Sequence, residues 1–232
     1  VGAALIKCDG NVLPLFAHPS GYGRIALAYG KDQVYSIACS MDTDMDALFA
    51  QLSDVARSAG RFVMFDLKKY LPVLGAVCQK NCFDATVAAY LLNPLKSTYT
   101  YDDVAKEYLD GILLPAREDL LGKDSLKTVW EGSSDGLMPY GCYMAYTALT
   151  ARIPLEISMK DSGMWQVYRE IELPLIFTLD SMEKYGICVK GEELKTYGKK
   201  LQVRIEELEK QIYEEAGEEF NINSPKQLGT IL

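Results

Sequence analysis

Residues 24–39, "RIALAYGKDQVYSIAC", decide the fold. Two short apolar runs, "RIALAYG" and "QVYSIAC", are joined at Gly30-Lys31-Asp32. Short apolar runs with a glycine-containing turn between them predict two adjacent antiparallel strands. The run before them, "VLPLFAH" at residues 12–18, also predicts a strand. We therefore expect an antiparallel meander near the start of the chain.

Strands and helices alternate after the meander. Residues 41–60 predict a helix that begins with acidic residues and is followed by Gly60. "RFVMFDL" (61–67) predicts a buried strand, and "CFDATVAAYLLNPLK" (82–96) predicts a strand end that feeds a helix stopped at Asn93-Pro94. Helices are also expected after Thr100 and over residues 136–157. This order predicts an α/β fold, with a mixed sheet and helices on both faces.

The character of the sequence changes near residue 159. Residues 164–186 predict a helix with Pro174 inside it, so a kink is expected there. Residues 191–217 predict a long amphipathic helix with a charged face. We therefore expect an α/β domain over residues 1–158 and an all-α segment over residues 159–232.

Composition limits the classes of function. The net charge of −8 and the pI near 4.8 argue against a fragment that grips nucleic acid by itself, because such binding needs Lys and Arg against phosphates. No apolar run approaches a membrane span. The six cysteines form no CxxC pair and there is one His, which excludes the usual Cys/His zinc site. We therefore expect the cysteines to be reduced thiols and the protein to be cytoplasmic.

The last residues, "EEAGEEFNINSPKQLGTIL" (214–232), begin a helix that is short. Ser224 suits the N-cap position and Pro225 suits the first helical position. A helix of barely two turns does not hold without a partner surface. We therefore expect this chain to be a piece of a longer protein.

Several stretches follow one another in the order found in bacterial DNA polymerase I, a family A polymerase. They are "FDATVAAYLLNP", "LMPYGCYMAYTAL", "YREIELPLIFTLDSMEKYGICV" and "EEAGEEFNINSPKQLGTIL". The resemblance implies a ribonuclease H-like (DnaQ-type) 3′–5′ exonuclease domain over residues 1–158. It also implies that residues 159–232 are the truncated start of the polymerase domain, at the base of the thumb.

The resemblance carries implications for the parent enzyme as well. A full-length polymerase would perform template-directed DNA synthesis in replication and repair, with DNA as its partner and no membrane association. It would use Mg²⁺ bound by carboxylates that lie outside this fragment. The fragment alone is expected to hold no cofactor.

The same resemblance puts nuclease activity in doubt. The family's exonuclease site binds two divalent ions through carboxylates at three places, because hard ions of this kind need oxygen ligands. Here the expected end of the first strand carries Ala17, His18 and Pro19. At the family's second ligand position, Tyr70 replaces the metal-binding Asp, and Asp66 lies where the family usually has an Asn.

At the third place Tyr140 is kept, but Met144 occupies the Asp position. The resemblance therefore implies a vestigial domain without nuclease activity, which would act as a structural scaffold for the polymerase. His18 is expected at a strand end and not as a catalytic base.

Two other functions stay open. One is a divergent nuclease with relocated carboxylates such as Asp66 and Asp84, although Asp84 is also suited to capping the helix after it. The other is a module that binds DNA or a protein in the cleft of the former nuclease site. The net negative charge of the chain disfavours DNA binding there. Four residues could contact DNA phosphates at the thumb base, or could serve only to cap a helix: Asn221, Asn223, Ser224 and Lys226.

Overall fold

The computed structural model describes residues 1–8, 21–30, 32–40, 42–75, 77–123, 126, 128 and 136–231. The chain divides into two compact units, Val1–Lys184 and Tyr185–Leu232, and each is described by itself. None of the helices in the described ranges is long and apolar enough to cross a membrane.

The first unit is built on a five-stranded mixed sheet with the order β3-β2-β1-β4-β5. The antiparallel part pairs β1 with β2 and β2 with β3, and the parallel part pairs β1 with β4 and β4 with β5. The strands have these bounds: β1 Gly2–Lys7, β2 Tyr22–Gly30, β3 Gln33–Ala38, β4 Phe62–Met64 and β5 Cys82–Asp84. The predicted hairpin, the two later strands and the mixed α/β class are confirmed.

Strand β1 is the element that sequence reasoning missed. Its sequence, "GAALIK", begins with glycine and two alanines, which are poor strand formers. Burial decides the outcome, since Ala3, Ala4 and Leu5 are each 0–1 % exposed. The strand expected at residues 12–18 lies outside the described residues.

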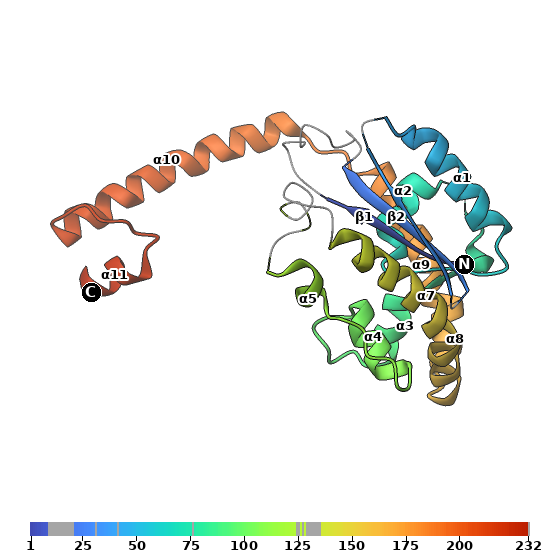
Figure 1. The fold of residues 1–232 in the computed structure, drawn as a ribbon. Helices are drawn as coiled ribbons and strands as arrows, with labels where there is room; N and C mark the ends of the chain where they lie inside the picture. Colours follow the sequence, from blue (N-terminus) through green and yellow to red (C-terminus); the bar gives the residue numbers. More distant parts are fainter. Residues whose placement is uncertain are drawn as a thin grey trace. The chain divides into compact units, whose positions relative to one another are not determined.

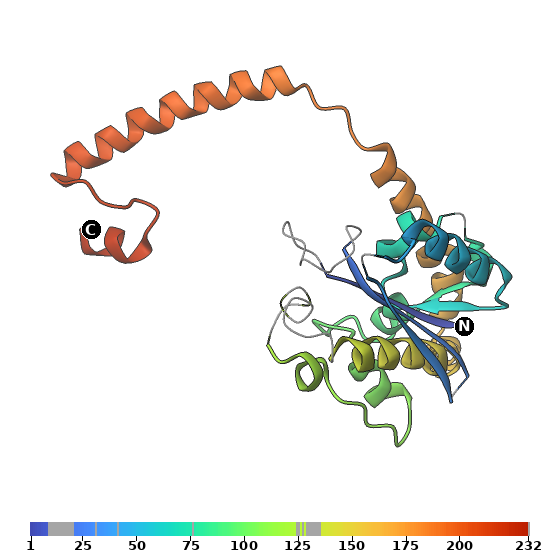
Figure 2. The same ribbon diagram turned by 45° about the horizontal axis from the view of Figure 1, so that its top comes forward.

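Helices cover both faces of the sheet. Helix α7 runs along one face, while α1 and α2 lie on the other (Figures 1 and 2). The helical elements of the first unit are α1 Met45–Ser58, α2 Leu67–Leu74, η1 Gln79–Asn81, α3 Ala85–Leu92, α4 Tyr101–Tyr108, α5 Arg117–Leu121, α7 Leu137–Asp161, α8 Trp165–Val167, η2 Tyr168–Glu172 and α9 Leu173–Tyr185.

Small residues let α7 approach the sheet closely. A Cβ atom on Gly2 of β1 would lie 2.2 Å from the carbonyl oxygen of Ala145. Ala145, Ala148 and Ala151 of α7 are fully buried. Because the backbones approach this closely, a larger side chain at Gly2 would force the strand and the helix apart.

Local caps explain where the predicted helices begin. The Asp44 carboxylate accepts the Ala47 N–H at 3.0 Å, so the acidic stretch before α1 acts at a helix N-terminus as expected. Thr100 and Asp103 form a capping box at α4. The five residues of η2, Tyr168–Glu172, form a π-helical turn just before Pro174. Proline has no backbone N–H to donate to the hydrogen bonds of a regular α-helix.

The predicted domain boundary at residue 158 falls inside α7. It stays a prediction about the parent protein, because compactness alone divides the chain between Lys184 and Tyr185. Tyr168, ten residues beyond the predicted boundary, is 1 % exposed and belongs to the core of the first unit.

The second unit is helical. Helix α10 (Gly191–Ala216) ends at Gly217, whose φ of +76° suits glycine at a helix C-terminus. After a turn, α11 (Pro225–Ile231) begins with Ser224 before it, and Ser224 Oγ accepts the Gln227 N–H at 3.4 Å. These bounds agree with the helices expected from the sequence.

Candidate functional site

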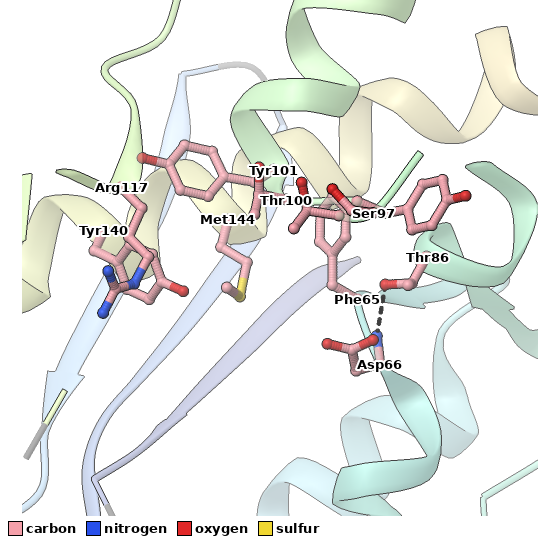
Figure 3. Close-up of a pocket in the computed structure, with 11 residues that line it drawn as sticks. Phe65, Asp66, Thr86, Ser97, Thr100, Tyr101, Arg117, Tyr140 and Met144 are labelled. Atoms are coloured by element: carbon pink, nitrogen blue, oxygen red, sulfur yellow. Dashed lines mark hydrogen bonds between the residues drawn. The ribbon is translucent and has the colours of Figure 1, made fainter. Parts of the chain in front are cut away.

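A pocket of about 270 Å³ opens beside α7 in the first unit (Figure 3). It is assembled from segments that are far apart in the sequence: the turn after β4, the start of α3, the loop before α4, and helices α4, α5 and α7. The lining residues are Phe65, Asp66, Thr86, Ser97, Thr98, Tyr99, Thr100, Tyr101, Arg117, Tyr140 and Met144.

The pocket brings together some of the residues that the sequence singled out. Tyr140 and Met144 lie one turn apart on α7, and Asp66 lines the same pocket (Figure 3). Tyr70 is buried in α2, at 7 % exposure, and does not line the pocket. Ala17, His18 and Pro19 lie outside the described residues.

Asp66 holds an unusual backbone conformation. Its φ of +52° is in the left-handed region, where Asp and Asn are tolerated better than most residues that carry a Cβ. Its N–H donates to Thr86 Oγ1 at 3.1 Å, and its side chain makes no capping hydrogen bond to α2. The carboxylate is therefore placed at the pocket by a strained turn between β4 and α2.

This strain gives a stability prediction. Replacing Asp66 with Ala is expected to lower the free energy of unfolding by about 1 kcal/mol, because Ala tolerates the left-handed region poorly. Asp66→Asn, the matched variant, should change it by less than about 0.5 kcal/mol because Asn is tolerated there. Urea unfolding of both variants measures the difference, and equal stability of the two would contradict the role of strain.

The charge around Tyr140 favours its neutral form. Burial raises the pKa of the Tyr140 hydroxyl, and the carboxylates of Asp66 and Asp102 raise it further, while Arg117 lowers it. The ring packs edge-on against Tyr101 with the centroids 5.6 Å apart. Tyr140 is therefore a packed, neutral phenol at physiological pH.

The described lining of the pocket offers few of the ligands that a pair of divalent cations needs. Among its described lining residues Asp66 supplies the only carboxylate, and Arg117 adds a positive charge. Phe65 and Met144 offer no oxygen. Mg²⁺-type ions are held by several oxygen ligands, chiefly carboxylates. Within the described ranges, no group of three or more His, Cys, Asp or Glu side chains is arranged to hold a metal ion.

Asp84 lies at the end of β5 and connects several elements. Its side chain accepts the Leu67 N–H at 2.8 Å and the Val87 N–H at 3.0 Å, so one carboxylate caps both α2 and α3. Its own N–H donates to the Tyr168 hydroxyl at 2.8 Å. Burial raises the pKa of the Asp84 carboxyl to about 6, against the lowering effect of these backbone hydrogen bonds.

The four residues that the sequence predicts as possible DNA contacts lie in the second unit, where local hydrogen bonds engage several of them. The Asn221 N–H donates to Gln227 Oε1 at 2.7 Å, and Asn221 Oδ1 accepts the Asn223 N–H at 3.0 Å. Ser224 caps α11, and Lys226 is exposed. These contacts account for the turn before α11, and contact with DNA stays a prediction.

Sequence reasoning missed Arg117 and Tyr101 as parts of the pocket. They come from α5 and α4, and no spacing in the sequence links them to Asp66 or Met144. Only the packing of α4 and α5 against α7 brings them to the same place.

Comparison with known proteins places this geometry in context. No family model matches the chain. DNA polymerase I of Bacillus subtilis (strain 168) is 38% identical over 174 residues, which is 73% of this chain and 19% of the relative. DNA polymerase I of Treponema pallidum (strain Nichols) is 33% identical over 161 residues, or 67% of this chain and 15% of the relative. The chain thus spans about one fifth or less of the relatives it matches.

A solved structure shares the fold. It is described as the POL domain of Pol1 from M. smegmatis in complex with DNA primer-template and dNTP. The TM-score is 0.66 at 22% identity, and the match covers 100% of this chain and 36% of that one. In both sequence and fold, this chain therefore resembles part of DNA polymerase I.

Proposed function

We propose that this chain is a fragment of a DNA polymerase I in which an inactive 3′–5′ exonuclease-like domain supports the polymerase. In this proposal residues 1–158 form the ribonuclease H-like (DnaQ-type) domain, and residues 159–232 begin the thumb. Template-directed synthesis would belong to the full enzyme, with Mg²⁺ held by carboxylates outside this chain and with DNA as the partner.

The observation that carries the proposal is the position of Met144. The family's third carboxylate place follows a Tyr by four residues on the last helix of the domain, and Tyr140 and Met144 keep this spacing on α7. Both side chains line the pocket, where a thioether replaces the expected carboxylate. A thioether is a soft ligand and does not hold Mg²⁺.

The first carboxylate place supports the same conclusion. If β1 is the family's first strand, its described end, Ile6, Lys7 and Cys8, carries no carboxylate, while Asp9, the next residue, lies outside the described residues. Ala17, His18 and Pro19 lie outside the described residues, so their assignment to that place stays a prediction beside this one. In this proposal the site lacks the ligands for the two ions that position the phosphate and activate water in the family.

The competing function is a nuclease with relocated carboxylates. Asp66 is strained and lines the pocket, which is typical of functional residues. Asp84, the other candidate, is 2 % exposed and its side chain accepts the backbone N–H groups of two helices. This bonding favours a structural role for Asp84.

Incubation with end-labelled single-stranded DNA and Mg²⁺ or Mn²⁺ separates the two functions. We expect no metal-dependent shortening of the strand above the level of a buffer control. Shortening that needs the metal and is lost in Asp66→Asn would establish the relocated site. The Asn variant is preferred to Ala because it keeps the left-handed turn.

A further inference from the structure

We draw no further inference here: the strongest candidate, the apolar groove between α2 and α9 that Pro72, Leu175 and Leu179 help to line, carries nothing because no contact in the described part of the chain shows what covers this face.

Discussion

Asp84→Ala is expected to lower the free energy of unfolding by about 3 kcal/mol at pH 5.5. The change removes one side chain that accepts the N–H groups of Leu67 and Val87, at the starts of α2 and α3. Each buried donor left without a partner costs about 1–3 kcal/mol, and a lost N-cap costs about 1 kcal/mol. Urea unfolding of the variant and the wild type measures the difference.

The loss should shrink as the pH rises. The pKa of Asp84 is raised from 3.8 to about 6 in the folded protein, so the folded state binds the proton more tightly than the unfolded state does. The contribution of Asp84 to the wild-type free energy of unfolding is therefore present at low pH and is lost as the pH rises through 6. Between pH 5.5 and 7.5 the cost of Asp84→Ala should fall by about 1 kcal/mol. This window stays above the pI near 4.8.

Asp44→Ala is the matched control, because Asp44 caps α1 alone through a hydrogen bond to Ala47 that is exposed to solvent. It should cost about 1 kcal/mol. Equal losses in the two variants would contradict the role of Asp84 as a buried double cap.

Tyr168→Ala is expected to lower the free energy of unfolding by about 4 kcal/mol, the usual cost of deleting a buried aromatic ring. The ring is 1 % exposed and packs against Phe83 at 5.1 Å and Trp165 at 5.8 Å between centroids. Its hydroxyl accepts the Asp84 N–H at 2.8 Å. The helical segment after α7 is therefore held to β5 through this residue.

Tyr168→Phe isolates the hydroxyl and should cost about 1–2 kcal/mol, because the ring remains while the buried Asp84 N–H loses its acceptor. Tyr185→Ala, at a residue 96% exposed, should leave the stability nearly unchanged. Thermal unfolding of all three variants gives the comparison. A small effect of Tyr168→Ala would mean that residues beyond α7 do not stabilise the α/β unit.

Local patterns were sufficient for most of the fold. The glycine turn predicted the β2–β3 hairpin, and the acidic residues at the start of residues 41–60 and Thr100 marked helix starts that the structure confirms. Strand β1 could not be predicted in this way, because its alanine-rich sequence becomes a strand only when neighbouring strands and α7 bury it.

The candidate site was predictable only in part. The spacing of Tyr140 and Met144 on one helix was visible in the sequence, and the structure places both side chains in one pocket. Arg117 enters the pocket from α5, and the hydrogen bond from Leu67 to Asp84 joins residues 17 apart. Such contacts depend on how distant segments pack, which no local pattern encodes.

Our central proposal is that the pocket lined by Tyr140 and Met144, which we assign to a former nuclease site, does not bind a pair of cations. Anomalous scattering from crystals of this chain soaked in manganese tests it most directly. We expect no ordered manganese beside Tyr140 and Met144. Two well-ordered ions in that pocket, coordinated by side chains of this chain, would contradict the account.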